Sequence, residues 1–397
     1  MKLAKRVKEM RESEIRKFME VSIRPGMISF AGGLPSPHSF PIKEIERLSI
    51  KVLKNEGTMA LQYGATEGVR EFRRTIAKRM NKKLKIKCKE ENVLITTGSQ
   101  QVLDLVTKIF VDPRDLVVVE VPTYIGALCS FRNYQSKFLT VGMDSEGMKV
   151  DELESKLREM NKKKRERIKF IYSIPNFHNP KGITLSMERR KHLLEISKKY
   201  QIPILEDDPY IELRYRGKTL PTMKSMDKEG LVIYTSTFSK ILSPGLRLGW
   251  VVADGELIKK LSMAKQGTDL STNVFSQYIA NEYIKTGLVD KHIPKIRKMY
   301  KKREEVMLES LEEYFPDGCE WTKPDGGMFL WVTLPKKINT KKMFNEAIKR
   351  KVAYIHGAAF CVDGSGYNEM RLNFSNQDEN NIREGIKRLG NLIKKKL

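Results

Sequence analysis

Long apolar runs are absent from this sequence. The runs that are present, such as the one around residues 116–121, are far shorter than the roughly 20 apolar residues that a membrane-spanning helix requires. The opening residues, MKLAKRVKEM, do not develop the apolar core of a signal peptide, so we do not expect export. Cysteine is scarce as well: the four cysteines are widely spaced and form no CxxC pair. This pattern argues against a disulfide framework or a zinc site and indicates reduced thiols in a cytoplasmic protein.

Acidic residues are in the minority, with 49 Asp and Glu against 74 Lys and Arg, which gives a formal net charge of +25. Such an excess could serve binding to a nucleic acid or another anionic surface. The lysines are spread along the chain, however, mostly in helical patterns with interspersed glutamates, and no nucleic-acid-binding motif accompanies them. We therefore interpret the charge as a solvated, lysine-rich surface and expect neither nucleic acid nor membrane as a partner.

The chain also lacks internal repeats, low-complexity tracts and Gly/Ser linkers. Short runs rich in β-branched residues instead alternate with longer helical patterns, and they predict strands at residues 93–96, 116–120, 169–173, 203–206, 231–235 and 249–253. Most of these runs are apolar on both faces, which is typical of strands covered by helices on each side. Strands separated by helices imply right-handed crossovers, so the sequence predicts an α/β fold with a mostly parallel sheet.

The pattern changes after about residue 290. A long charged helix is predicted at 293–314, short strands at 328–332, 352–354 and 370–374, and a closing amphipathic helix at 378–395. We expect a large domain over residues 47–290 and a smaller α+β domain formed by residues 291–397 together with residues 1–46. Ligands of parallel α/β sheets collect at the carboxyl ends of the strands, and the distinctive residues of this sequence follow those ends.

The strongest signal is the segment TSTFSKILSPGLRLGW, residues 235–250, where Lys240 follows a strand in a turn rich in hydroxyl groups. A lysine becomes a nucleophile when its surroundings lower its pKa enough to present a neutral amine. Thr237, Ser239 and Arg247 offer two hydroxyl donors and a guanidinium fork, which suit a phosphate dianion. A lysine in such a turn would by itself more often be an ordinary surface residue, so the interpretation depends on its companions.

Asp207 and Tyr210 belong to the motif EDDPY, directly after another strand. A buried carboxylate there could keep the ring nitrogen of a cofactor protonated, and the phenol could donate to an oxygen on the same ring. The alternative is a metal cluster of the three adjacent acids. In a third motif, TGSQQ, Ser99 is expected to cap a helix that starts near Gln101, whose free N–H groups would form an anion site.

Three further residues complete the set of candidates. Asn179, in PNFHNPKG, could donate to the same ring oxygen, although Asn-Pro is also a simple turn signal. Tyr124, in PTYIG, could stack on a cofactor ring or be an ordinary core aromatic. Arg371 lies in an otherwise apolar strand, where a buried guanidinium requires an anion. That anion could be a substrate carboxylate or an internal carboxylate.

In their order and spacing, these motifs resemble the fold-type I, class I/II aminotransferases over about residues 13–392. The resemblance is strongest to the subgroup of LysN-type 2-aminoadipate, multi-substrate aromatic and kynurenine/2-aminoadipate aminotransferases. It is carried by SEIR at 13–16, ISFAGGLP at 28–35, LQYG at 61–64, GSQQ at 98–101 and the motifs around Asn179, Asp207, Lys240 and Arg371. It implies the fold-type I architecture of the PLP-dependent transferases and pyridoxal 5′-phosphate (PLP) as the cofactor.

The resemblance also implies a role for each candidate. Lys240 would bind PLP as a Schiff base, with Asp207 at the ring nitrogen, and Tyr124 would stack on the ring. Asn179 and Tyr210 would contact the 3′-oxygen. The residues around the phosphate would be Ser99, Gln100, Thr237, Ser239, Arg247 and, across a homodimer interface, Tyr63. Gly33 and Arg371 match contacts to the substrate α-carboxylate, and Arg16 matches an arginine of a mobile N-terminal helix that meets a side-chain carboxylate.

Two residues beside Asn179 depart from the family pattern. His178 and Lys181 stand where relatives usually carry other residues, and we interpret His178 as a packing or hydrogen-bonding residue. The implied reaction is a ping-pong transamination in which the freed amine of Lys240 moves the Cα proton. Glutamate and 2-oxoglutarate are the expected common pair, with aromatic, aliphatic or 2-aminoadipate partners.

Two alternatives stay open. A PLP-dependent lyase or decarboxylase could use the same scaffold, because a fold does not fix a reaction. A PLP-sensing transcription regulator would carry an additional N-terminal winged-helix domain, for which we expect the segment before Ile28 to be too short.

Overall fold

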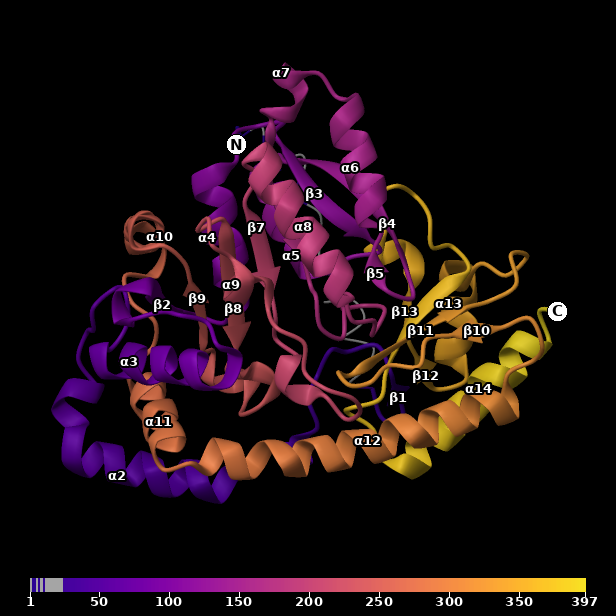
Figure 1. The fold of residues 1–397 in the computed structure, drawn as a ribbon. Coiled ribbons are helices and arrows are strands. Elements are labelled where there is room, and N and C mark those ends of the chain that lie inside the picture. Colours follow the sequence, from indigo (N-terminus) through magenta and orange to yellow (C-terminus); the bar gives the residue numbers. More distant parts are fainter. Residues whose placement is uncertain (1, 5, 8–9, 11–23) are drawn as a thin grey trace.

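A mixed sheet of eight strands forms the centre of the larger part of the molecule in a computed structural model of the chain (Figure 1). The structure describes residues 2–4, 6–7, 10 and 24–397. The strand order is β2-β9-β8-β7-β6-β3-β4-β5. The strands are β2 (Val93–Thr96), β3 (Leu116–Val121), β4 (Lys137–Asp144), β5 (Gly147–Met148), β6 (Ile168–Ser173), β7 (Ile204–Asp207), β8 (Val232–Thr237) and β9 (Gly249–Val252).

The five strands from β8 to β4 run parallel, which confirms the expected mostly parallel sheet. Strand β9 is antiparallel to both β2 and β8, and β5 is antiparallel to β4. Strand β4 has no counterpart among the strands predicted from the sequence. This strand has an exposed or half-buried surface at all but one of its positions, so its apolar signal is weak.

Helices cover both faces of this sheet, and alternate residues of β3 demonstrate it. Val117 and Val119 belong to the main core, whereas Val118 belongs to a second core together with Leu153 and Leu193. The helices of this part are α2 (Ile42–Ala60), α3 (Arg70–Arg79), α4 (Ser99–Phe110), α5 (Ile125–Asn133), α6 (Val150–Glu159), α7 (Lys162–Arg165), α8 (Met187–Tyr200), α9 (Met223–Met226), α10 (Gly255–Asp269) and α11 (Val274–Lys285). Helix α4 packs on α5 and α10, while α6 packs on α8.

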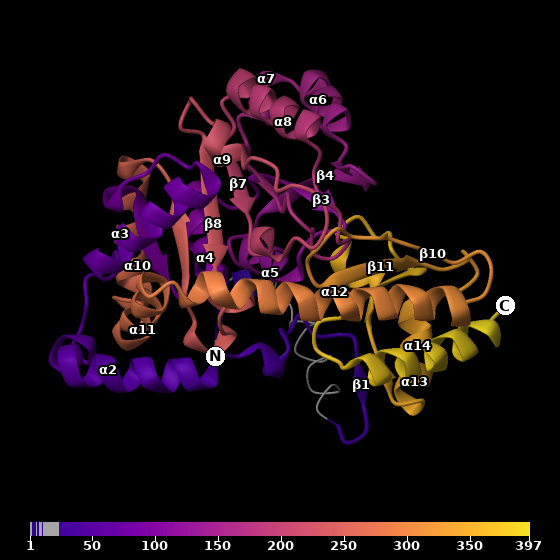
Figure 2. The same ribbon diagram turned by 60° about the horizontal axis from the view of Figure 1, so that its bottom comes forward.

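The C-terminal part contains a four-stranded antiparallel sheet of order β10-β11-β14-β13. Its strands are β10 (Glu320–Trp321), β11 (Phe329–Thr333), β13 (Ile355–His356) and β14 (Glu369–Asn373), and its helices are α13 (Thr340–Lys349) and α14 (Glu379–Lys394). The long helix α12 (Leu288–Tyr314) runs from α11 to α14 and so links the two parts (Figures 1 and 2). None of the helices in the described part of the chain is long and apolar enough to cross a membrane.

The segment around residue 30 joins the C-terminal part although it is far from it in sequence. Strand β1 (Ile28–Ser29) pairs in parallel with β12 (Val352–Ala353). Beyond β1, the N–H group of Asn373 donates to the carbonyl oxygen of Phe30 at 2.9 Å. The chain then continues to Gly33, whose carbonyl oxygen accepts a hydrogen bond from Lys240. This segment therefore contacts both the smaller sheet and the carboxyl ends of the strands of the large sheet.

Candidate active site

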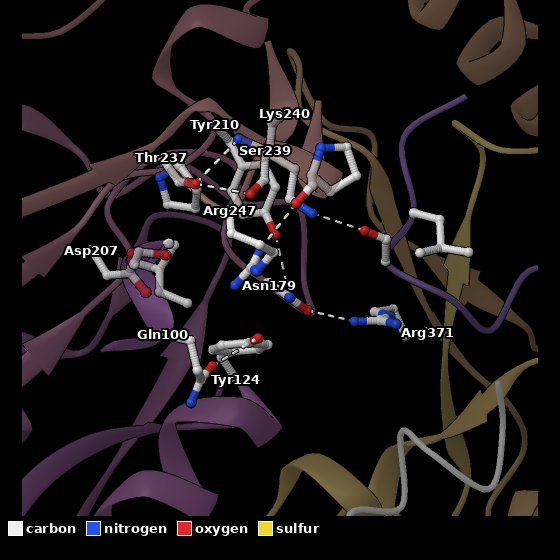
Figure 3. Close-up of a pocket in the computed structure, with 17 residues that line it drawn as sticks. Gln100, Tyr124, Asn179, Asp207, Tyr210, Thr237, Ser239, Lys240, Arg247 and Arg371 are labelled. Carbon is white, nitrogen blue, oxygen red and sulfur yellow. Dashed lines mark hydrogen bonds between the residues drawn. The ribbon is translucent and has the colours of Figure 1, made fainter. Parts of the chain in front are cut away.

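A cavity of about 290 Å³ lies at the carboxyl ends of the parallel strands (Figure 3). It is walled by residues of the large sheet, by the segment after β1 and by β14. Nearly all the candidates from the sequence line it: Gly33, Ser99, Gln100, Tyr124, Asn179, Asp207, Tyr210, Thr237, Ser239, Lys240, Arg247 and Arg371. Residues separated by more than 300 positions in sequence therefore meet at one place.

Lys240 ends a short 3₁₀ turn (Phe238–Lys240) that follows β8. Its Nζ donates to the carbonyl oxygen of Gly33 at 2.9 Å. Burial, with the nearby positive charges of Arg371 and Arg247, lowers the pKa of Lys240 to about 8, against the opposing effect of Asp207. Near neutral pH an appreciable fraction of this amine is therefore neutral, which is the form that acts as a nucleophile.

The first turn of α4 forms one end of the cavity. Helix α4 starts at Ser99 with Gly98 as its N-cap, so the expectation that Ser99 caps the helix is wrong by one position. Gly98 has a φ of +74°, which favours glycine. A Cβ atom on Gly249 would lie 2.6 Å from the backbone nitrogen of Ser99, so this glycine lets β9 approach the turn closely.

Groups suited to an anion surround this turn. The hydroxyl groups of Thr237 and Ser239 lie 2.9 Å apart, and Nη2 of Arg247 donates to the carbonyl oxygen of Thr97 at 3.3 Å. Arg247 is exposed, and among the described residues its guanidinium hydrogen-bonds to backbone carbonyl oxygens, those of Pro244 and Thr97, rather than to a carboxylate. The free N–H groups of α4 add the positive end of a helix dipole. This end of the cavity can therefore hold a phosphate.

Asp207 lies buried at the end of β7, on the side of the cavity away from Arg371 (Figure 3). The hydroxyl of Tyr172 donates to Oδ2 of Asp207 at 2.8 Å, whereas Oδ1 has no hydrogen-bond partner within the described residues. Burial raises the pKa of Asp207 to about 7, against the opposing effects of the Tyr172 hydrogen bond and of Lys240. A buried, unpartnered carboxylate oxygen at a cavity wall suits a cationic N–H donor.

The two acids that flank Asp207 face other partners. Glu206 accepts hydrogen bonds from the backbone N–H groups of Met223 and Lys224, at 2.9 and 2.8 Å. Oδ1 of Asp208 accepts from Asn176 at 2.9 Å. Within the described ranges, no group of three or more His, Cys, Asp or Glu residues could hold a metal ion. Geometry thus gives no support to the alternative of a metal cluster at EDDPY.

The middle of the cavity is bounded by Tyr124, Asn179 and Tyr210 (Figure 3). The Tyr124 hydroxyl donates to Oε1 of Gln100 at 3.3 Å, and a Cβ on Gly126 would lie 2.4 Å from the Tyr124 ring. Glycine at 126 therefore leaves room for that ring. The Nδ2 group of Asn179 donates to the Tyr210 hydroxyl at 3.4 Å. Burial raises the pKa of Tyr210, so its hydroxyl stays protonated at neutral pH.

Arg371 lies buried in β14, where its Nη1 donates to Oδ1 of Asn179 at 2.7 Å and its Nη2 to the carbonyl oxygen of Ala31 at 2.6 Å. Its guanidinium carbon is 4.3 Å from the ring centre of Phe329 and 5.0 Å from that of Phe360. Burial lowers the pKa of Arg371 to about 10. Its printed hydrogen bonds go to an amide and a backbone carbonyl oxygen, so among the described residues the internal salt bridge considered from the sequence is not formed.

Two candidates are not placed in this cavity. Tyr63, which follows α2, is 83% exposed and does not line the cavity. Arg16 lies outside the described residues.

His178 is buried with Nε2 at 3.0 Å from Oε2 of Glu120, and its Nδ1 accepts from the backbone N–H of Lys181 at 3.4 Å. These contacts agree with the interpretation of His178 as a packing and hydrogen-bonding residue.

Comparison with known proteins adds to this geometry. The sequence model of the family described as aminotransferase class I and II matches residues 32–389. Aromatic-amino-acid aminotransferase 1 of Thermococcus litoralis is 47% identical over 388 residues, which cover 98% of this chain and 93% of that protein.

Solved structures match over nearly the whole of both chains. Pyrococcus horikoshii kynurenine aminotransferase, in complex with PMP, has a TM-score of 0.95 at 47% identity, with 100% of this chain and 97% of that chain covered. The α-aminoadipate aminotransferase LysN from Thermus thermophilus, complexed with N-(5′-phosphopyridoxyl)-L-leucine, has a TM-score of 0.91 at 37% identity. That match covers 99% of this chain and 97% of that chain.

Proposed function

We propose that this chain, which belongs to the class I and II aminotransferases, moves an amino group between an amino acid and a 2-oxo acid such as 2-oxoglutarate. The proposed amino acids are aromatic amino acids, kynurenine and 2-aminoadipate. The chain shares the fold-type I architecture of this family and uses PLP. Family membership confirms the resemblance inferred from the motifs. The similarity to an aromatic-amino-acid aminotransferase at 47% identity supports an enzyme over a PLP-sensing regulator. One observation carries the proposal: a single cavity joins the amine of Lys240 to an unpartnered carboxylate oxygen and to an arginine without a described carboxylate partner.

The residues of this cavity fit PLP from one end to the other. The first turn of α4, with Ser99, Gln100, Thr237, Ser239 and Arg247, would hold the phosphate. Oδ1 of Asp207 would accept from the ring nitrogen, because it is buried and otherwise unpartnered. Asn179 and Tyr210 would contact the 3′-oxygen, and Tyr124 would lie on the ring. When bound, PLP supplies a carbonyl that accepts the amino group and a ring that withdraws electrons from the substrate.

The side chains then determine what happens to the substrate. Arg371 would bind the α-carboxylate with the N–H groups that it does not give to Asn179 and Ala31, and the carbonyl oxygen of Gly33 would border the same place. This contact fixes the orientation of the Cα–H bond. Nζ of Lys240, whose pKa is lowered to about 8, would take the Cα proton as a general base and later return a proton as a general acid.

A half-reaction screen tests this function. The holoenzyme is mixed with single amino acids without any oxo acid, and the cofactor absorbance and the products are followed. We expect pyridoxamine phosphate and the matching oxo acid, with kynurenine, aromatic amino acids and 2-aminoadipate as the fastest donors. Release of ammonia together with pyruvate would instead support the lyase alternative. An unchanged cofactor spectrum with every amino acid would contradict the proposal.

We also propose a homodimer in which Tyr63 reaches the phosphate site of the partner. The proposal is supported by the apolar surface around this residue: Leu61 is 71% exposed, Met59 61% and Tyr63 83%. A mixture of Lys240→Ala and Tyr63→Ala chains, refolded together, tests the arrangement. Hybrid dimers would contain one intact site and recover activity that neither parent has. If the mixture is no more active than the parents, the shared site is wrong.

Two broader proposals remain from the sequence. We propose that residues 47–290 form one domain and that residues 1–46 with 291–397 form the other, supported by the pairing of β1 with β12. We also propose a cytoplasmic location, supported by four cysteines that are all free thiols.

A further inference from the structure

Tyr172 is a fully buried tyrosine of β6 that does not line the cavity, yet it contacts a cavity residue. Its hydroxyl donates to Oδ2 of Asp207 at 2.8 Å. The contact follows from the strand register, because Tyr172 pairs with Leu205, which lies on the same face of β7 as Asp207. The Tyr172 ring is held by an edge-on contact with Phe131, with ring centres 5.3 Å apart. The position of the hydroxyl is therefore set by the core.

The two oxygens of the Asp207 carboxylate consequently differ. Oδ2 is occupied by Tyr172, whereas Oδ1 is buried without a partner among the described residues. Burial raises the pKa of Tyr172 well above its usual range, so this phenol stays protonated and can donate to Oδ2. A donor at Oδ2 favours the charged carboxylate and prevents its rotation, which burial alone would not do.

We propose that Tyr172 is a positioning residue for the cofactor ring: it fixes Asp207 through Oδ2, so that Oδ1 meets the ring nitrogen as a charged acceptor. The inference rests on the proposed contact between Asp207 and the ring nitrogen, and it assigns the orientation and charge of that contact to a residue outside the cavity. Tyr172 contributes a single hydroxyl, and the change Tyr172→Phe removes only that group.

The neighbouring strand offers a matched control. Tyr234, in β8, is also fully buried, but its hydroxyl has no hydrogen-bond partner in the described part of the chain. The change Tyr234→Phe therefore removes a buried hydroxyl without removing a contact to Asp207. The effects of the two variants should differ if the hydrogen bond, rather than the buried phenol, matters.

The experiment uses PLP and an analogue in which CH replaces the ring nitrogen. The full-length apoenzyme is titrated with each compound, and the ratio of the two dissociation constants measures what the ring nitrogen contributes to binding. We expect Tyr172→Phe to lower the preference for PLP by about tenfold or more, as for loss of a hydrogen bond to a charged group. We expect Tyr234→Phe to keep the wild-type ratio. An unchanged ratio in Tyr172→Phe would overturn the inference.

Both dissociation constants are measured on the same preparation of each variant. A partly unfolded fraction therefore affects both equally and cancels in their ratio. The variant Asp207→Asn distinguishes a failure of the proposed contact between Asp207 and the ring nitrogen from a failure of the proposed role of Tyr172. If Asp207→Asn keeps the wild-type preference, the proposed contact between Asp207 and the ring nitrogen fails. If Asp207→Asn abolishes the preference while Tyr172→Phe retains it, only the role of Tyr172 fails. In the double variant we expect no further loss beyond Asp207→Asn, whereas a general packing role would add its own effect.

Discussion

Replacing Arg371 with lysine tests how the cavity recognises a substrate carboxylate. Two guanidinium N–H groups are used within the protein, at 2.7 Å to Asn179 and 2.6 Å to Ala31, and the remaining ones would face the substrate. Lysine keeps the charge but lacks the planar fork, so at least one charge-assisted hydrogen bond is lost. Such a bond contributes about 1.5–3 kcal/mol, which corresponds to roughly 10- to 150-fold in kcat/KM.

The assay compares an amino acid with the amine that lacks its α-carboxylate. We expect Arg371→Lys to lower kcat/KM for the amino acid by that factor and to leave the slow reaction of the amine nearly unchanged. Arg214 provides the control, because it is also buried against a phenylalanine, with its guanidinium carbon 4.7 Å from the ring centre of Phe177, but does not line the cavity. Arg214→Lys should leave both substrates unaffected. Equal losses for both substrates in Arg371→Lys would refute the reasoning.

Two further predictions concern the lysine and the phosphate end. The positive charge of Arg247 helps to lower the pKa of Lys240. In Arg247→Gln, the pH midpoint for the rate of PLP binding by the apoenzyme should therefore move from about 8 to a higher value. An unmoved midpoint in stopped-flow absorbance would contradict this. A Cβ on Gly249 would meet Ser99 at 2.6 Å, so Gly249→Ala should cost about 1–3 kcal/mol and weaken PLP binding, as measured by titration and thermal unfolding. Gly245→Ala, whose nearest contact would be at 3.7 Å, should change neither quantity.

Much of the fold follows from periodicity. Strands such as β2 and β6 are buried along their whole length or nearly so, and their apolar runs identify them in the sequence within one residue. Strand direction is not contained in such a pattern, so the antiparallel β9 was not distinguished from its parallel neighbours. Strand β4 lies towards the sheet edge and is half exposed, which removes the signal altogether. Pairing partners that lie far apart in sequence decide these features.

The cavity could be assembled from the sequence because its polar residues follow strand ends. Lys240, Asp207 and Arg371 stand out as charged residues beside or within apolar runs. The residues that support them do not. Tyr172 and Phe329 resemble ordinary core aromatics, and only the three-dimensional contacts reveal that one hydrogen-bonds to Asp207 while the other packs on Arg371. The role of Gly249 depends on the approach of β9 to the first turn of α4, which no local pattern encodes.

Borohydride reduction of the holoenzyme, followed by peptide mass spectrometry, tests most directly whether Lys240 binds PLP. We predict one phosphopyridoxyl group per chain, located on Lys240, and no label in the Lys240→Ala variant. Lys181 is a suitable control because it is also a half-buried lysine whose pKa is lowered by burial, and Lys181→Ala should leave the labelling of Lys240 unchanged. A label on another lysine of the wild-type protein, or a fully labelled Lys240→Ala variant, would contradict the account.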